Sequence, residues 1–410
     1  MWTSPDERPS RDHGPPVERR RLGEAPTGVD GSTVGRRRLE GAPTANLMIR
    51  IDRRLLQNVD WLLLATACGL VAIGAVTLSS LSVGRAGGGV VLRQLAWFGV
   101  GVIALIVMAS LDYRKLVRVA PVFYVLGLAG LVAVFTLGRT VSGARRWIAL
   151  GPVTVQPAEL FKLCFVLMAG WILTSRWTRP VGGTTLLLLL PVLAVPVVLI
   201  VKQPDLGTAL LLFPVLAALL AAAGMRLRLL GGLALAGLAG LPLAWLVMKD
   251  YQRERILVFL DPVRDPLGSA YNVIQAKIAI GSGQLLGKGV AGATQSRLAF
   301  LPERHTDFIF AVFAETWGFV GCLALLTGYA LLLLRGFDIA ASAREPVGRL
   351  VALGATALLA TQILINVGMV SGLLPVVGVP LPLLSYGGSS MLVSLTALGL
   401  LLSVRMRQFQ

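Results

Sequence analysis

Long apolar runs separated by short polar segments dominate the chain. From Trp61 onward, one stretch after another contains no Asp, Glu, Lys or Arg. A helix needs about 20 mostly apolar residues to span ~30 Å of hydrocarbon. Ten spans are predicted, at approximately 61–81, 95–111, 120–138, 158–174, 183–201, 208–224, 231–248, 308–334, 351–370 and 388–404. The pattern predicts an all-α polytopic membrane protein with about ten transmembrane helices, and it excludes an ordinary soluble enzyme.

Basic residues are distributed unequally between the two sides that these spans define. With both termini inside, the inside loops and tail after the first span carry twelve Lys and Arg, whereas the short outside loops carry six. Eleven further Arg lie in residues 1–60. Because cytoplasmic loops carry an excess of Lys and Arg, we expect a multi-pass membrane protein with both termini in the cytoplasm.

The polar segments divide the chain into three regions. Residues 1–58 are rich in Arg, Pro and Gly and lack apolar periodicity, which predicts a disordered cytoplasmic tail. The membrane domain covers 59–405 and includes a large extracytoplasmic loop at 249–307, and 406–410 form a cytoplasmic tail. A structureless loop of that length is unusual, so we expect short helices and a functional role in it.

Composition agrees with a membrane protein: 55% of residues are hydrophobic and 14% are charged. The net charge of +17 raises nucleic-acid binding as an alternative. No recognition module accompanies the arginines, so we interpret them as an orientation and lipid-surface signal, with no nucleic-acid partner. The three cysteines lie far apart inside apolar runs, which gives no metal-ligand spacing.

Ionisable residues at the start of the fourth predicted span are candidates for function. Glu159 and Lys162 follow Gln156 and Pro157, and their spacing of three places them on one helical face. Charged groups within spans are costly, which favours a functional role. The alternative is a mutually neutralising pair that tolerates burial.

Two outside turns also carry charge. Arg145 and Arg146 precede Trp147, a combination that suits phosphate binding or lipid-headgroup anchoring. Lys202 and Asp205 form either an outward charge pair or a capped turn.

The large loop contains two Asp-Pro steps, which begin at Asp261 and Asp265. Asp before Pro is frequently turn chemistry, and the functional alternative is a carboxylate that acts as a general base. A Gly-rich string follows, but only three residues separate Gly283 from Gly287, and Gly289 stands where a phosphate loop requires Ser or Thr. ATP hydrolysis therefore has no support.

Polar residues also surround the start of the eighth predicted span. Thr306 and Asp307 follow His305 there, and either one predicts a helix N-cap. Glu315 lies about 12 Å into that span if the helix is regular, so it needs a partner, for which we expect a basic residue on a neighbouring helix.

Taken together, five strings in this order resemble the SEDS family of shape, elongation, division and sporulation proteins. They are Ser142-Gly-Ala-Arg-Arg-Trp147, Gln156-Pro-Ala-Glu159, Gln203-Pro-Asp-Leu-Gly207, Leu301-Pro-Glu-Arg-His-Thr-Asp-Phe-Ile-Phe310 and Leu384-Ser-Tyr-Gly-Gly-Ser-Ser390. The strings Asn272-Val-Ile-Gln-Ala-Lys-Ile-Ala-Ile-Gly-Ser-Gly283 and Glu303-Arg-His305 are more similar to the RodA-like elongation branch than to the FtsW-like division branch.

The resemblance implies a peptidoglycan glycosyltransferase of the bacterial cytoplasmic (inner) membrane. Such an enzyme polymerises lipid II into glycan strands at the outer face during cell elongation and shape maintenance. Its substrates are lipid II and the glycan on undecaprenyl pyrophosphate. Its partners are a class B penicillin-binding protein, which is a single-span transpeptidase, and other elongation-complex proteins.

The resemblance also assigns site residues. The family's essential aspartate corresponds to Asp265, whereas Asp261 does not take that role. The candidates for substrate binding are Gln156, Glu159, Lys162, Arg145, Arg146, Lys277 and Ser385. Several relatives carry Arg where this chain has Thr154, so we expect Arg145 or Arg146 to compensate. The sequence contains no dedicated metal site, although a divalent cation, Mg or Mn, could share the pyrophosphate charge with Asp or Glu as ligands.

Two other functions remain open from the sequence. A lipid II flippase would need a polar cavity around Glu159, Lys162 and Glu315 and would tolerate loss of Asp265. A non-catalytic scaffold for the transpeptidase would depend on interface positions in the eighth and ninth spans and would tolerate loss of both Asp265 and Lys162.

Overall fold

The computed structural model describes residues 58–82, 88–141, 144–151, 153–175, 181–261, 270–293 and 303–408. All of them belong to one compact unit, Ile49–Gln410. The predicted N-terminal tail, apart from Asn58, and Asp265 lie outside the described residues.

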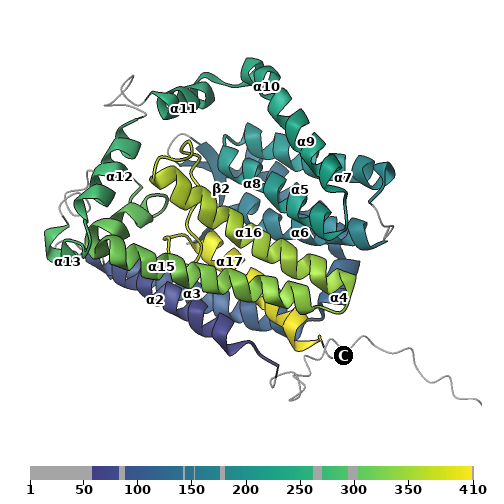
Figure 1. The fold of residues 1–410 in the computed structure, drawn as a ribbon, viewed down its shortest axis with the longest axis horizontal. Coiled ribbons are helices and arrows are strands. Elements are labelled where there is room, and N and C mark those ends of the chain that lie inside the picture. The colour runs from purple at the N-terminus through teal and green to yellow at the C-terminus, as the bar shows by residue number, and fades with distance from the viewer. Residues whose placement is uncertain are drawn as a thin grey trace, which may run out of the picture. The chain divides into compact units, whose positions relative to one another are not determined.

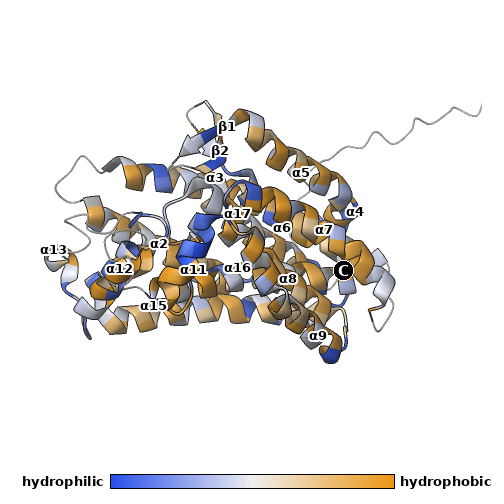
Figure 2. Cartoon of the chain, turned by 90° about the horizontal axis from the view of Figure 1, so that it is seen from above, coloured by the Kyte–Doolittle hydropathy of each residue, from blue (hydrophilic) through white to orange (hydrophobic). Residues whose placement is uncertain are grey.

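Within the described residues, eight helices are long and apolar enough to cross a membrane (Figure 1). They are α2 (Trp61–Ser82), α3 (Gly88–Ser110), α5 (Ala120–Leu137), α6 (Pro157–Ser175), α7 (Gly183–Lys202), α15 (Ile309–Ser342), α16 (Pro346–Val370) and α17 (Gly388–Met406). Two shorter apolar helices, α8 (Leu206–Ala222) and α9 (Leu227–Ala239), coincide with the sixth and seventh predicted spans. The predicted polytopic helical fold is confirmed, and its apolar helices contrast with the hydrophilic helix α11 (Asp250–Leu260) in Figure 2.

The seventh predicted span is divided in the structure. Helix α9 ends at Ala239, Gly240 follows, and α10 (Leu241–Val247) begins directly after it. No residue of α9 is buried inside the protein, since this helix contacts only α8 and α10 to any extent. A continuous apolar run in the sequence cannot reveal such a break, because glycine is common in membrane helices.

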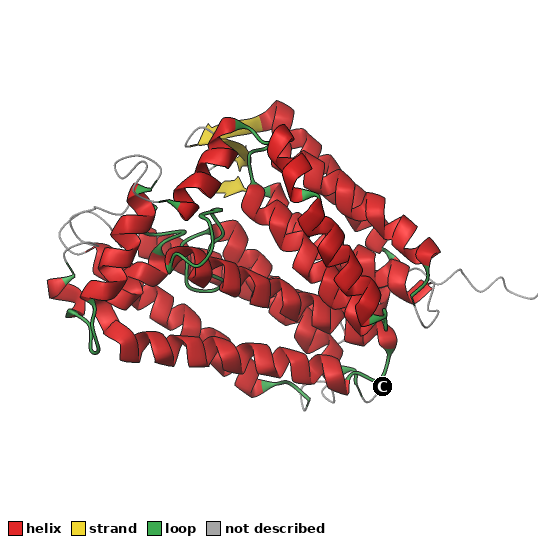
Figure 3. Cartoon of the chain, turned by 45° about the horizontal axis from the view of Figure 1, so that its top comes forward, coloured by secondary structure: helices red, strands yellow, loops and turns green. Residues whose placement is uncertain are grey.

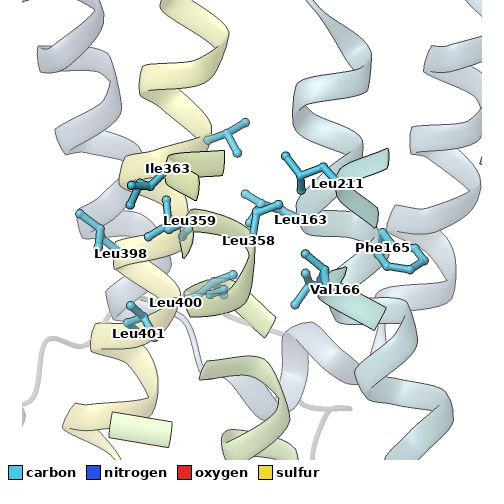
Figure 4. Close-up of a cluster of buried hydrophobic side chains, with 14 of the residues drawn as sticks. Leu163, Phe165, Val166, Leu211, Leu358, Leu359, Ile363, Leu398, Leu400 and Leu401 are labelled. Atoms are coloured by element: carbon cyan, nitrogen blue, oxygen red, sulfur yellow. The ribbon is translucent and has the colours of Figure 1, made fainter. Parts of the chain in front are cut away.

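The core of the bundle forms where α6, α8, α16 and α17 meet. Leucine, valine, isoleucine and phenylalanine side chains from these helices fill the space between them (Figure 4). Helix α17 also packs along α3 at very short range, because a Cβ atom on Gly399 would lie 2.6 Å from the carbonyl oxygen of Leu105. Small residues at such contacts allow two helix backbones to approach closely in a membrane.

Ion pairs connect helices at the end of the bundle that the predicted orientation places in the cytoplasm. Arg335 on α15 lies 2.6 Å from Asp60, which precedes α2. Arg114, on the short helix α4 (Tyr113–Arg118), lies 2.8 Å from Glu345 at the start of α16. Each pair connects two segments that are far apart in the sequence. Both pairs lie at the end of the helix bundle opposite the site described below.

The loop at 139–157, which the predicted orientation places outside, contains a small antiparallel sheet, which the sequence analysis did not predict. Strands β1 (Gly138–Val141), β2 (Ala144–Leu150) and β3 (Val153–Val155) pair in the order β1-β2-β3 (Figure 3). The expectation of an all-α protein therefore needs this local correction. Strands of three to seven residues are too short to produce a periodicity that differs from an irregular loop.

The large loop contains short helices, as expected. Helix α11 is followed by α12 (Tyr271–Ser282) and α13 (Gly289–Gly292). Between α12 and α13, the Gly-rich string packs against a break in α15 at Gly318, where φ is 65°. The amide groups that this break frees donate to the string, from Phe319 N to Gln284 O at 2.8 Å and from Val320 N to Leu285 O at 3.0 Å. The segment 283–288 is therefore attached to α15 through backbone hydrogen bonds, and we call this attachment the clasp.

The expected partner of Glu315 also comes from this clasp. Glu315 is fully buried in α15, and the Nζ atom of Lys288 lies 4.0 Å from its carboxylate. Lys288 N also donates to the carbonyl oxygen of Glu315 at 3.0 Å. The prediction of a basic partner is confirmed, but Lys288 belongs to the large loop and not to a neighbouring membrane helix.

Candidate functional site

A cavity of about 460 Å³ opens at the helix ends that the predicted orientation places outside. The first turns of α6 and α17 and the residues that lead into α15 form part of its wall, together with β2, α11 and the loop between α16 and α17. Its polar and aromatic lining residues are Trp97, Arg146, Trp147, Thr154, Gln156, Glu159, Arg255, Glu303, Thr306, Asp307, Tyr386 and Ser390. The cavity therefore joins five segments that are far apart in the sequence.

Glu159 lines this cavity and forms an ion pair with Lys162. Pro157 opens α6, so that Glu159 lies in the first turn, where a carboxylate is stabilised by the helix dipole. Lys162 Nζ lies 2.7 Å from Glu159 Oε1, and both side chains are almost completely buried. Glu159 Oε2 has no hydrogen-bond partner among the described residues. Glu159 lines the cavity, and Lys162 supports it from behind.

Gln156 connects the cavity wall to the start of α8. Its Nε2 atom donates to Asp205 Oδ2 at 2.8 Å, and its backbone N donates to Ser389 Oγ at 3.0 Å. Asp205 also caps α8, since its carboxylate accepts from Thr208 N at 3.3 Å. The capped-turn interpretation of Asp205 is therefore confirmed. Gln156 holds α6, α8 and α17 in register at the cavity.

The two arginines of β2 point in different directions. Arg146 lines the cavity and donates from Nε to the carbonyl oxygen of Gln203 at 3.2 Å and from Nη2 to that of Pro204. Arg145 is exposed and donates to the carbonyl oxygen of Phe135 at 3.2 Å. Adjacent residues of a strand face opposite sides, so only Arg146 contributes to the cavity.

Two other predicted site residues do not line this cavity. Lys277 is exposed on α12 and lines a second cavity of about 30 Å³, whose wall it shares with Arg255. Ser385 is buried, and its hydroxyl donates to the carbonyl oxygen of Thr306 at 2.6 Å while it accepts from Leu381 N at 2.8 Å. Ser385 therefore fixes the loop that precedes α17. The predicted catalytic residue Asp265 lies outside the described residues.

Asp307 has a different role from the predicted N-cap. The N-cap of α15 is Phe308, with no side-chain hydrogen bond, and Asp307 lines the cavity. Burial raises the pKa of Asp307 to about 6, and the neighbouring carboxylate of Glu303 adds to the shift. The prediction was wrong because the chain bends before α15, which turns this carboxyl group away from the helix start.

Arg255 is a cavity residue that the sequence analysis missed. It lies on α11, where Arg253 and Glu254 precede it, and nothing in this charged run distinguishes one arginine from the other. A helical wheel would have separated their faces, but only the position of α11 against the loop after α16 decides which face meets the cavity. Arg255 Nη1 donates to the carbonyl oxygen of Val376 in that loop at 3.2 Å.

The described residues contain no group of three His, Cys, Asp or Glu side chains arranged to hold a metal ion. What the cavity offers is two guanidinium groups, three carboxyl groups and the positive ends of the helix dipoles of α6, α15 and α17. Such a site can hold an anionic group at one part of its wall and accept hydrogen bonds from hydroxyl groups at another.

The chain matches one protein-family model and is similar to named bacterial proteins. The family model described as cell cycle protein, FTSW_RODA_SPOVE, matches residues 57–410. The peptidoglycan glycosyltransferase MrdB of Escherichia coli (strain K12) is 42% identical over 340 residues, which cover 82% of this chain and 91% of that protein. The probable peptidoglycan glycosyltransferase FtsW of Alkalilimnicola ehrlichii is 37% identical over 364 residues, covering 85% and 89%.

Solved structures of the same architecture are also similar. One chain, from work on the structural coordination of polymerization and crosslinking by a peptidoglycan synthase complex, has a TM-score of 0.73 and 35% identity and covers 86% of this chain and 99% of its own length. The rod shape determining protein RodA of Thermus thermophilus has a TM-score of 0.65 and 32% identity and covers 86% and 98%.

Proposed function

This chain belongs to the FtsW/RodA/SpoVE family of cell cycle proteins, and on that premise we propose that it is a peptidoglycan glycosyltransferase. It polymerises lipid II into glycan strands at the outer face of the cytoplasmic membrane during cell elongation and shape maintenance. The observation that carries this proposal is the cavity at the helix ends, which Glu159 lines and where the buried Lys162 pairs with it. Ionisable groups at such a position are functional by default.

The proposed reaction is glycosyl transfer with inversion. The 4-hydroxyl oxygen of a lipid II GlcNAc attacks the anomeric carbon of the growing strand, and the bond from that carbon to the undecaprenyl pyrophosphate oxygen breaks. The electron pair leaves with the pyrophosphate. The hydroxyl proton passes to Asp265, which acts as the general base, a role worth typically about 10²–10⁴-fold in rate. The assignment of Asp265 rests on the family resemblance.

The cavity residues stabilise the departing charge. Arg146 binds the pyrophosphate through charge-assisted hydrogen bonds, since its guanidinium faces the cavity. Glu159 accepts a hydrogen bond from substrate at its unpaired Oε2 atom, and Lys162 fixes its position. Gln156 keeps the wall in register through Asp205. Thr154 also lines the cavity, so Arg146 supplies the cation that relatives carry at that position.

A membrane-bound transpeptidase is the proposed partner. A solved relative comes from a complex that coordinates polymerization and crosslinking, which supports a class B penicillin-binding protein in the same role here, along with other elongation-complex proteins. The proposed orientation has both termini in the cytoplasm. Fusions of alkaline phosphatase to the C-terminus test it, and an active phosphatase would contradict it.

A requirement for a divalent cation, Mg or Mn, stays a proposal from the sequence. Since the described residues supply no group of three metal ligands, no step of the reaction is assigned to a cation. Chelation with EDTA, followed by addition of Mg²⁺ or Mn²⁺, tests the requirement. A polymerisation rate that EDTA leaves unchanged would contradict it.

The function is tested with purified protein, with and without its cognate transpeptidase, supplied with lipid II. We expect polymer on a gel from the wild type and from Asp261→Ala, which is the matched control at the other Asp-Pro step, and none from Asp265→Ala. Polymer from Asp265→Ala would overturn the base assignment. Absence of polymer from the wild type, with lipid II transfer between leaflets, would favour the flippase. Absence of both activities would favour the scaffold.

A further inference from the structure

Arg255 occupies an unusual position on helix α11. Its half-buried side chain lines the main cavity and also the second cavity of about 30 Å³ on the other side. The one hydrogen bond that it makes among the described residues goes from Nη1 to the carbonyl oxygen of Val376 at 3.2 Å. Among the described residues, no acceptor takes the other donors of this guanidinium.

The charge of Arg255 is not neutralised by a direct contact. No carboxylate of the described residues forms an ion pair with it, and the nearest ion pair in the cavity joins Arg146 and Asp205 at 4.0 Å. Burial lowers the pKa of Arg255, and the positive charge of Arg146 lowers it further, whereas Tyr251, Asp307 and Asp205 oppose the shift at longer range. Arg255 thus faces the cavity without an ion-pair partner among the described residues, whereas Arg146, the second guanidinium there, is paired with Asp205.

Partly buried charges of this kind are normally paired. An anion that enters the cavity would supply the partner that Arg255 lacks among the described residues, and the positive charge of Arg146 would attract the same anion. A planar guanidinium binds phosphate oxygens through two parallel hydrogen bonds, and the N-terminal ends of α6, α15 and α17 at the cavity favour negative charge in the same place. A diphosphate carries enough oxygens to accept hydrogen bonds from two guanidinium groups at once.

We propose that Arg255 binds the pyrophosphate of the polyprenyl-linked substrate in this cavity, with Arg146 as the second cation. This inference rests on the proposed function. Arg255 belongs to the helix that precedes Asp265 in the large loop, so one loop supplies a ligand for the leaving group and, under that proposal, the base. The contact strengthens as the bond to the pyrophosphate breaks, because negative charge then develops on the bridging oxygen.

Arg253 provides a matched control on the same helix. Its guanidinium donates to the carbonyl oxygens of Trp245 at 3.0 Å and Leu246 at 3.1 Å, so it is used within the loop itself and does not line the cavity. The test variant, Arg255→Gln, removes the charge and the paired N–H groups of the guanidinium and keeps a polar side chain, and a thermal unfolding control shows whether the loss of the bond to the carbonyl oxygen of Val376 affects the fold.

The direct test is binding of farnesyl pyrophosphate and farnesyl monophosphate to the detergent-purified full chain, measured by calorimetry. We expect the wild type and Arg253→Gln to prefer the pyrophosphate, and Arg255→Gln to bind it at least tenfold more weakly. Arg255→Lys keeps the charge without the paired N–H groups and is expected to lie between them. Equal pyrophosphate affinity in the wild type and a folded Arg255→Gln would overturn the proposal. If Arg255→Gln does not fold, an undiminished preference for pyrophosphate in Arg255→Lys overturns it.

Polymerisation separates this proposal from the function on which it rests. With lipid II as substrate, Arg255→Gln is expected to lose at least tenfold in kcat/KM, while Arg253→Gln matches the wild type. If the wild type makes no polymer, the proposed function fails, and the calorimetry still decides whether Arg255 binds a pyrophosphate. If the wild type makes polymer and Arg255→Gln does so with the same kcat/KM, only the role of Arg255 fails.

Discussion

Lys162 and Glu159 form a buried ion pair near the N-terminus of α6, where the Nζ and Oε1 atoms lie 2.7 Å apart. The pair leaves the second carboxylate oxygen of Glu159 without a hydrogen-bond partner among the described residues, in the wall of the cavity. Burial of two charges gives little net stability, because the loss of hydration offsets their attraction. The arrangement is therefore better explained by a need for a fixed carboxylate at the cavity than by folding.

The substitution Lys162→Met is expected to destabilise the protein and to abolish polymerisation. It leaves the carboxylate of Glu159 buried without its partner, which typically costs about 3–5 kcal/mol. Thermal unfolding in detergent and the lipid II gel assay measure the two effects. Lys202→Met, at an exposed lysine near the same side of the bundle, serves as control and should change neither.

The double variant Glu159→Gln with Lys162→Met separates stability from function. Because no unpaired charge remains, its melting temperature is expected to recover toward that of the wild type, while polymer is still absent. Polymerisation at the wild-type rate in this double variant would show that the pair serves the fold alone.

Asp307 is expected to make stability depend on pH between about 4 and 6. Its pKa is raised from 3.8 to about 6, chiefly by burial, so the folded protein binds this proton more tightly than the unfolded chain. Its contribution is therefore fully present below the ordinary pKa and is lost as the pH rises through about 6. The melting temperature of the wild type should fall more steeply from pH 4 to pH 7 than that of Asp307→Asn. Asp250→Asn, at an exposed carboxyl group of the same loop, should retain the wild-type slope. Equal slopes in all three proteins would contradict the assignment.

Gly318→Ala is expected to loosen the clasp between the large loop and α15. The backbone of Gly318 has φ 65° and ψ −164°, which only glycine adopts readily, and a Cβ atom there would overlap with the backbone of Gly287. We expect a loss of at least about 2 kcal/mol in stability and reduced polymerisation, measured by unfolding and by gel. Gly328→Ala is the control on the same helix, since its Cβ would lie 3.4 Å from the side chain of Leu70, an ordinary contact. Wild-type stability of Gly318→Ala would mean that the break in α15 can close without cost.

The neighbouring arginines of β2 are expected to differ in their effects. Arg146→Gln removes a guanidinium from the cavity and should lower kcat/KM for lipid II at least tenfold, as charge-assisted hydrogen bonds contribute about 1.5–3 kcal/mol. Arg145→Gln changes an exposed side chain outside the cavity and should leave kcat/KM within about twofold. A larger effect of Arg145→Gln than of Arg146→Gln would contradict the direction in which β2 presents its side chains.

The fold was largely predictable, but details at two places were not. Runs of apolar residues located α5, α6 and α16 to within a few residues, because hydrocarbon thickness fixes the length of a span. The break at Gly240 and the strands around Arg146 left no signal, because glycine is common in membrane helices and strands of three to seven residues are too short to show a periodicity.

The candidate site divides in the same way. Glu159 and Lys162 were predicted from local spacing at the start of one span and Gln156 from the family resemblance, and the structure places all three at the cavity or directly behind it. Ser385 was predicted as well, yet its hydroxyl is used by the loop before α17. Arg255 was missed, because nothing in the charged run Arg253-Glu254-Arg255 distinguishes one arginine from the other.

The sequence by itself determined which segments lie in the membrane, since burial in hydrocarbon depends on the composition of each span alone, and it located the polar groups at the span ends. Only the tertiary structure decided which of these groups meet. Arg146, Glu159, Arg255 and Asp307 come from four separate segments and share one cavity. Their convergence depends on how the helices pack and where the loops bend, which are properties of the whole fold.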